Sequence, residues 1–197
     1  KKLSESPFLS SGIGGILHVA SNYSRRFEEV ILQVPKGRSL KGINVSTNRG
    51  QTSITNATLE NATLNTNSYI LRIKGSRIKN SKLTTPNIVN IFDTDLTDSQ
   101  LESTKNHFHA ENIKVYGKVE LSSKNALSIM LTQKESQEIN LDLSSHHGPI
   151  YQLSRDESQR HPNELSNPYK TEKTDAKGQL IAKADDYISL ETTANRP

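Results

Sequence analysis

An internal repeat in the middle of the chain constrains its fold more than any other feature. Single apolar residues recur there at steps of 19, 19, 18 and 17 residues: Leu40, Leu59, Ile78, Leu96 and Ile113. Two further apolar columns follow the same drift: Val45, Leu64, Leu83 and Leu101, and then Ile54, Ile73, Ile91 and Phe108. One such repeat is too short to bury its own apolar row. The columns therefore predict coils that stack on one another.

Each repeat contains a pair of five-residue units with a shared pattern. A small residue is followed by any residue and then by Leu or Ile, and the unit usually closes with Asn, Asp, Ser or Thr. The clearest pairs span residues 57–66, 76–85 and 94–103. We expect the Leu or Ile and the small residue to point into a narrow core. The closing polar residue would turn the chain at a corner and bond backbone groups.

These units resemble the pentapeptide repeat, and the resemblance implies a right-handed β-helix with four sides. Residues 38–47 and 111–121 match only in part, because Arg38 and Glu111 take the small position. The predicted fold is therefore all-β: a right-handed β-helix (β-solenoid) of about five coils. Two alternatives remain. A left-handed hexapeptide helix would repeat every six residues, and an antiparallel sandwich would need Asn-Gly or Asp-Gly turns, which the sequence lacks.

Three segments of the chain differ in composition and in the spacing of their apolar residues. Residues 1–25 carry apolar residues at helical spacing, which predicts an N-terminal helical cap. Residues 26–145 form the predicted β-helix. Residues 146–197 are polar and contain Pro, which indicates a C-terminal extension or cap. Within that extension, residues 179–190 predict a small hairpin.

The charge of the chain is modest but unevenly placed. The net charge is +4, from 25 basic and 21 acidic residues. No acid occurs between Glu60 and Asp93, while five basic residues gather there: Arg72, Lys74, Arg77, Lys79 and Lys82. We call this set the basic stripe, a candidate surface for an acidic partner. Stacking offers another interpretation, because Arg77 would face Asp95, and Lys79 would face Glu60, as cross-strand pairs.

Few residues suggest catalysis or metal binding. Asp93 and Asp95 would share a strand face, and paired carboxylates are the chemistry of glycosidases. They are the candidate catalytic carboxylates, although solvated acids beside a basic coil would look the same. The pairs at 107/109 and 146/147 are histidines, but Zn²⁺ needs three or four converging ligands. The chain has no Cys. We expect no metal site and no cofactor.

A second resemblance concerns function. In its length, expected helical cap and Asn-, Ser- and Lys-rich composition, the chain resembles the N-terminal β-helix domain of HECT-like ubiquitin-ligase effectors of enteric bacteria. That resemblance implies a secreted virulence protein that is delivered into a host cell. Its catalytic Cys would lie in a part of the protein beyond this chain.

We therefore expect a non-catalytic protein-recognition module of a bacterial secreted effector. Its partner would be a host protein or another protein, bound on a face of the β-helix, and an acidic partner surface would suit the basic stripe. The alternative is a small β-helical protein that binds or cleaves glycans. We expect no specific nucleic-acid partner. The sequence contains no run of 18 apolar residues that would span a membrane.

Overall fold

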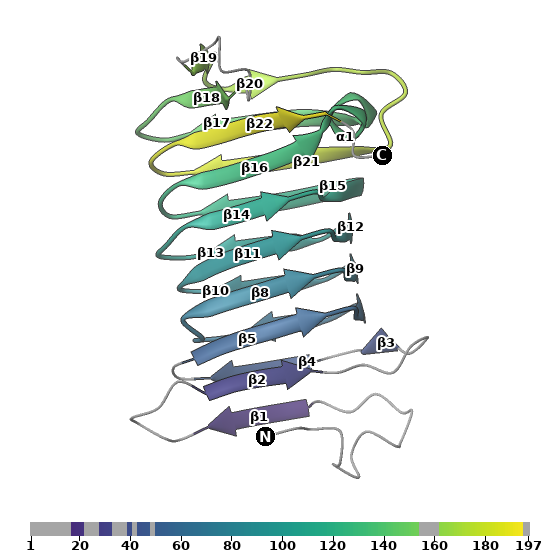
Figure 1. Ribbon diagram of the computed structural model, residues 1–197, viewed down its shortest axis with the longest axis vertical. Coiled ribbons are helices and arrows are strands. Elements are labelled where there is room, and N and C mark those ends of the chain that lie inside the picture. Colours follow the sequence, from purple (N-terminus) through teal and green to yellow (C-terminus); the bar gives the residue numbers. More distant parts are fainter. Residues whose placement is uncertain are drawn as a thin grey trace.

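The computed structural model shows an all-β, solenoid-like chain whose strands stack into a tall column (Figure 1). It describes residues 51–153 and 162–194 with their side chains. Before residue 51 it describes only strand backbone: β1 (Leu17–Ser21), β2 (Glu28–Leu32), β3 (Ser39–Leu40), β4 (Ile43–Thr47) and the first residue of β5. One helix of six residues, α1 (Gln133–Glu138), lies in this described part.

Each central coil contributes one strand to each of three faces. The first face stacks β5 (Gly50–Thr55), β8 (Ile70–Lys74), β11 (Ile88–Phe92) and β14 (Phe108–Glu111). The second face stacks β6 (Thr58–Glu60), β9 (Arg77–Lys79) and β12 (Asp95–Thr97). The third face stacks β7 (Thr63–Asn65), β10 (Lys82–Thr85) and β13 (Gln100–Ser103). All these strands pair in parallel with their neighbours.

The C-terminal half of the column is built out of sequence order. It contains β15 (Lys114–Ser123), β16 (Leu127–Thr132), β17 (Ile139–Ser145), β18 (Ile150–Leu153), β19 (Asn163–Leu165), β20 (Tyr169–Lys170), β21 (Gly178–Ala184) and β22 (Ile188–Thr193). β21 pairs in parallel with both β15 and β17, and β22 pairs with both β16 and β18. The last strands of the chain thus fill the place between two earlier coils (Figure 1).

This insertion corrects the predicted hairpin at residues 179–190. β21 and β22 lie in two different sheets and do not pair with each other. The last edges of the two sheets are instead paired with the short antiparallel strands β19 and β20, which lie beside β18 and β17. Short antiparallel strands at a sheet edge limit pairing with other chains.

The predicted apolar columns are confirmed in the central coils. Leu59, Ile78 and Leu96 stack in register and are almost fully buried. In the next coil the prediction is wrong by two residues, because Leu96 pairs with Val115 rather than Ile113. Likewise, Ile91 pairs with Ala110, while Phe108 lies opposite Val89. A shift of two keeps the same side of a strand inward, so alternation alone cannot detect it.

Left-handed residues form two columns at the corners between faces. Asn56, Gly75, Asp93 and Asn112 turn the chain after the first face. Asn61, Asn80, Asp98 and Gly117 turn it after the second face, with φ between 44° and 61°. Asn, Asp and Gly tolerate this conformation better than other residues. The prediction that the closing polar residue turns the chain is therefore confirmed at the second corner.

Small hydroxyl side chains complete the hydrogen bonding of each corner. The Ser81 hydroxyl accepts from the Ala62 N–H at 3.0 Å and donates to the Lys79 carbonyl at 2.7 Å. Ser99 repeats this arrangement one coil later, accepting from the Ser81 N–H at 3.1 Å. The small residue is thus needed both for its size and for its hydroxyl.

The predicted N-terminal helix is wrong where it can be compared with the structure. Leu17–Ser21 forms strand β1, which pairs in parallel with β4. The rest of the segment predicted as a helical cap, residues 1–16 and 22–25, lies outside the described residues.

Candidate functional site

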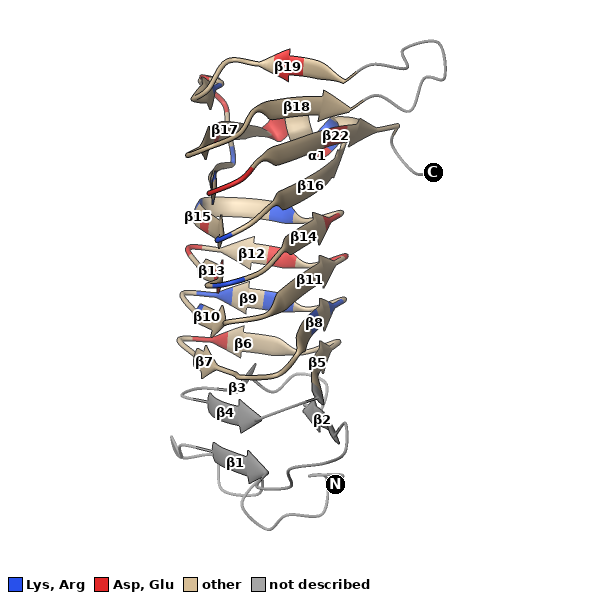
Figure 2. Cartoon of the chain, turned by 90° about the vertical axis from the view of Figure 1, so that its left-hand side faces the viewer, with Lys and Arg blue, Asp and Glu red and all other residues tan. Residues whose placement is uncertain are grey.

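The basic stripe is not a single patch but a band around one coil. Arg72 and Lys74 lie on β8 of the first face, whereas Arg77 and Lys79 lie on β9 of the second. Lys82 lies on β10 of the third face. Figure 2 shows the basic segments of β8 and β9 at one level of the column. No single flat partner would contact all five side chains at once.

Two of these cations are held by acids of neighbouring coils. Arg77 Nε lies 3.6 Å from Asp95 Oδ2, and Lys79 Nζ lies 3.4 Å from Glu60 Oε1. Both cross-strand pairs were predicted from the repeat, and both are confirmed. Arg72, Lys74 and Lys82 form no ion pair with any described carboxylate. These three remain available to an anionic partner.

Arg72 belongs to a cluster of outward side chains on the first face. Its guanidinium carbon lies 5.5 Å from the centre of the Phe92 ring. The Phe92 and His109 ring centres are 5.6 Å apart, and His109 Nε2 lies 3.6 Å from Glu111 Oε2. Lys74 lies directly beside Phe92 in the strand register. We call Arg72, Lys74, Phe92 and His109 the aromatic patch.

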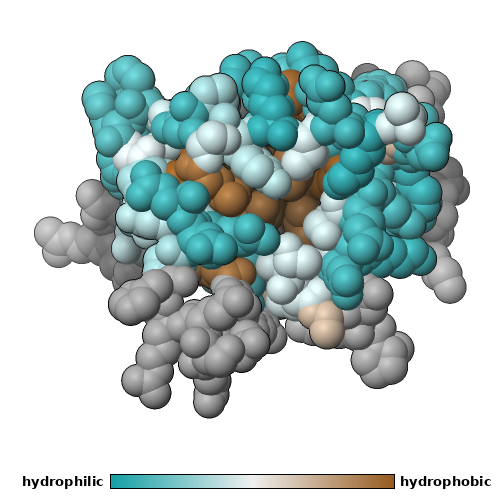
Figure 3. Space-filling view, turned by 90° about the horizontal axis from the view of Figure 1, so that it is seen from above, coloured by the Kyte–Doolittle hydropathy of each residue, from teal (hydrophilic) through white to brown (hydrophobic). Residues whose placement is uncertain are grey.

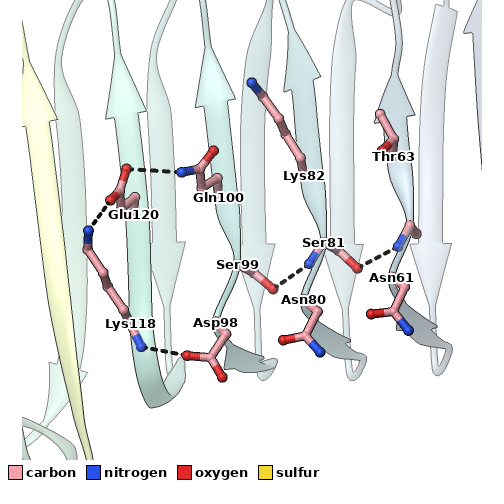
Figure 4. A pocket seen from close by; sticks show the side chains of 11 residues that line it. Asn61, Thr63, Asn80, Ser81, Lys82, Asp98, Ser99, Gln100, Lys118 and Glu120 are labelled. Carbon is pink, nitrogen blue, oxygen red and sulfur yellow. Dashed lines mark hydrogen bonds and ion pairs between the residues drawn. The ribbon is translucent and has the colours of Figure 1, made fainter.

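A second candidate surface is a groove of about 560 Å³ along the second corner. It crosses β7, β10 and β13 in the direction of the stack (Figure 4). The side chains of the corner column form one set of lining groups, and the outward residues of the third face form the other. Ala62, Ser81 and Ser99 lie at the bottom of the groove. The other lining residues are Asn61, Thr63, Asn80, Lys82, Asp98, Gln100, Lys118 and Glu120.

At one end of the groove the lining is formed by an irregular turn in β15. The Asp98 carboxylate accepts from the Lys118 N–H at 2.9 Å, and a Cβ on Gly117 would lie 2.1 Å from Asp98 Oδ1. A side chain at Gly117 would displace the Asp98 carboxylate, and the φ of +61° also favours glycine. Lys118 Nζ then pairs with Glu120 Oε1 at 2.8 Å, and Gln100 donates to the other Glu120 oxygen at 3.3 Å. The hydrogen bond from Lys118 lowers the pKa of Glu120.

The candidate catalytic carboxylates are engaged elsewhere. Asp93 lies at the first corner and accepts a 3.0 Å hydrogen bond from the Asn112 amide. Asp95 lies on β12 and pairs with Arg77. They do not share one strand, and neither lines the groove. Within the described residues, no group of three or more His, Asp or Glu side chains could hold a metal ion.

Comparison with known proteins now gives a family. A family model described as Toastrack DUF4097 matches residues 1–191. The chain belongs to this family. No curated protein and no solved structure matches it significantly. This match overturns the resemblance to pentapeptide-repeat β-helices and, with it, to HECT-like effectors. The described coils also have three strands, not four sides of five residues.

Sequence reasoning missed most of the residues that line these two surfaces of the Toastrack chain. Asn61 and Asn80 were expected only to turn the chain, yet their side chains line the groove. Phe92 was not singled out, although it lies beside Arg72. The repeat itself contained a signal, because outward residues at equal positions in successive coils must be neighbours. In the part of the chain with described residues, no helix is long and apolar enough to span a membrane.

Proposed function

We propose that this Toastrack protein is a non-catalytic recognition module that binds an acidic surface of a partner protein. The aromatic patch on the first face carries the proposal. Arg72 and Lys74 have no carboxylate partner among the described residues, and Phe92 lies between them and His109. Arginine and aromatic side chains are enriched among the residues that contribute most to protein interfaces.

The backbone under the patch favours tight recognition. β8 pairs in parallel with β5 on one side and β11 on the other, so both backbone edges are hydrogen-bonded. Leu71, Ile73 and Ile91 anchor the same strands in the core and are almost fully buried. A side chain on such a strand loses little backbone freedom when a partner binds, which lowers the entropic cost of association.

The glycan-cleaving alternative receives less support from the geometry. Asp93 and Asp95 each have a hydrogen-bond or ion-pair partner within the coil stack, on different sides of a corner. A glycosidase needs both carboxylates to face one bond of its substrate. Catalysis by this pair would therefore need both carboxylates to leave these partners.

Finer expectations about the coils, the N-terminus and the destination of the protein accompany this proposal. We propose that the coils follow a right-handed path, as nearly all parallel crossover connections do. The count of about five coils stays a prediction, as does an N-terminal helical cap in the part of residues 1–25 outside β1. Secretion of the protein, and delivery into a host cell, also stay predictions, although the resemblance to effectors that implied them is overturned.

The test replaces the two free cations of the patch with residues that the neighbouring coil uses at the same positions. Ser53 and Thr55 pair with Arg72 and Lys74, so the variant is Arg72→Ser with Lys74→Thr. The matched control is Arg77→Thr with Lys82→Thr, because Thr58 and Thr63 pair with those residues. Each variant removes two positive charges, but from different faces.

Affinity capture from lysate would nominate partners, and binding of each purified partner would then be measured. We expect the patch variant to bind the partner about tenfold more weakly or worse, and the control to bind like the wild type. Binding should also weaken as salt rises. Equal binding by the patch variant and the control would contradict the proposal.

A further inference from the structure

The groove at the second corner has lining groups that the fold itself does not use. The side chains of Asn61, Asn80 and Lys82 form no hydrogen bond or ion pair with any described residue. In Figure 4 the amides of Asn61 and Asn80 lie in a row with Asp98, and Lys82 extends away from this row along the third face. Unused donors and acceptors that line one groove are the elements of a binding site.

These groups repeat with the period of the solenoid. Asn61, Asn80 and Asp98 occupy one column, and adjacent coils lie about 4.8 Å apart. Thr63, Lys82 and Gln100 form a second, parallel column on the third face. The groove therefore presents a polar group at each step along its length. A ligand that matched it would itself be a linear chain with a short, regular repeat.

The chemistry of the lining favours a sugar chain over a peptide. Ala62 is the only apolar residue among those that line the groove, so it offers no pockets for apolar peptide side chains. β10 and β13 beneath the groove are each paired with both neighbours, so neither offers a free sheet edge for an added peptide strand. Carboxamides both donate and accept, as the hydroxyl groups of a sugar ring require.

The charged residues of the lining indicate which class of sugar chain the groove would bind. Lys118 is neutralised by Glu120, whereas Asp98 keeps its charge and accepts from the Lys118 N–H with one oxygen. Lys82 is the lining cation without a described carboxylate partner. An ammonium group in such a groove forms its strongest contacts with an anionic acceptor.

We propose that the groove binds a linear acidic glycan that lies along the solenoid axis. Asn61 and Asn80 hydrogen-bond the ring hydroxyls, and Lys82 pairs with a uronic acid carboxylate. The irregular turn at Gly117 and Lys118 stops the chain at one end. This site lies on a different face from the aromatic patch, so either assignment can fail without the other.

The test is a titration of the whole chain with hexagalacturonate, in which binding is measured by calorimetry or by NMR. The groove variant is Asn80→Gly with Lys82→Thr. Gly117 and Thr63 occupy these columns in other coils of the stack, so both replacements suit the backbone. The matched control is Asn56→Gly with Lys74→Thr, since Gly75 and Thr55 occupy the corresponding columns at the first corner. Both variants lose one corner amide and one ammonium group.

We expect saturable binding of hexagalacturonate to the wild type and to the control. The groove variant should bind it about tenfold more weakly, because it lacks one charged and one neutral contact. Neutral cellohexaose should bind the wild type more weakly than hexagalacturonate. Circular dichroism would establish that both variants retain the strand spectrum of the wild type.

Several results would overturn the proposal. One is the absence of saturable binding of hexagalacturonate to the wild type, and another is equal binding by the groove variant. Equal affinity for cellohexaose would exclude the acidic ligand. Equal affinity for hexaglutamate would show that charge attracts any polyanion, and that the lining does not recognise sugar.

Discussion

The corner residue of each coil determines whether the next coil can form. Asn61, Asn80 and Asp98 adopt positive φ, which costs most L-residues on the order of 1 kcal/mol or more. Their backbone N–H groups then donate to carbonyls of the next coil, as Asn61 does to Lys79 at 3.1 Å. The polar residue at each corner is thus selected for its backbone, and its side chain remains available for other contacts.

Residue-level features followed well from the sequence where they depend on local spacing. The pairs Arg77–Asp95 and Lys79–Glu60 were predictable because the repeat places equal positions side by side. The positions of Ile113 and Phe108 were not, since a two-residue slip leaves both side chains buried. The individual residues of the groove and of the aromatic patch could not be assigned before the corners were known, because the corners decide which outward positions share a face.

The hydroxyl ladder gives the first prediction. Ser81→Ala leaves the Ala62 N–H, which has Ser81 as its acceptor, without a partner inside the stack. An unpaired buried donor costs about 1–3 kcal/mol, so the free energy of unfolding should fall by that amount. Urea denaturation followed by circular dichroism measures the change.

The matched control for Ser81 is Ser128→Ala. Ser128 points outward from β16 and shows no side-chain hydrogen bond with a described residue. Its replacement should change the free energy of unfolding by less than about 0.5 kcal/mol. Equal effects of the two substitutions would mean that the ladder does not stabilise the corner.

At the scale of elements, the basic stripe and the C-terminal strands show what the sequence could not predict. Five cations close together in sequence are divided among three faces, because two corners fall within the stripe. β21 and β22 have local hairpin spacing, but both pair with strands formed much earlier in the chain. Such non-local pairing leaves no signal in a short window of sequence.

Ion pairs stabilise the inserted strands β21 and β22, and they make the free energy of unfolding depend on pH. Asp185 pairs with Lys124, and Glu138 pairs with Lys177 at 2.9 Å; the lysine in each case lowers the pKa of the carboxyl group. A carboxyl pKa that is lower in the folded state stabilises the fold above the usual value of about 4. That contribution is lost as the pH falls through the folded pKa.

We therefore expect the urea midpoint to fall as the pH is lowered from about 5 to about 2. Lys124→Ala with Lys177→Ala should flatten this dependence, because the two carboxyl groups then titrate more nearly as they do in the unfolded chain. Lys74→Ala with Lys82→Ala removes two cations without a described ion pair, so it should keep the slope of the wild type. An unchanged slope in the first variant would contradict the assignment.

At the scale of the whole molecule, one apolar core runs through the described coils from Ile54 to Leu190. The upper part of the column is visible in Figure 3, where apolar atoms lie within a ring of polar ones. The inserted coil supplies core residues between two coils that precede it in sequence. Removal of the inserted coil would therefore separate the end of the stack from the middle. This distinguishes the inserted coil from a C-terminal extension that packs on the outside of the column.

The last prediction tests that distinction. Leu180 of β21 is fully buried, so Leu180→Ala should lower the free energy of unfolding by about 2–5 kcal/mol, as in the centre of a core. Leu153→Ala is the control, because Leu153 is 37% exposed and should cost less than about 1 kcal/mol. Urea denaturation measures both. If β21 were instead part of a terminal hairpin that frays, Leu180→Ala would cost no more than Leu153→Ala, and the core would have to end at β16.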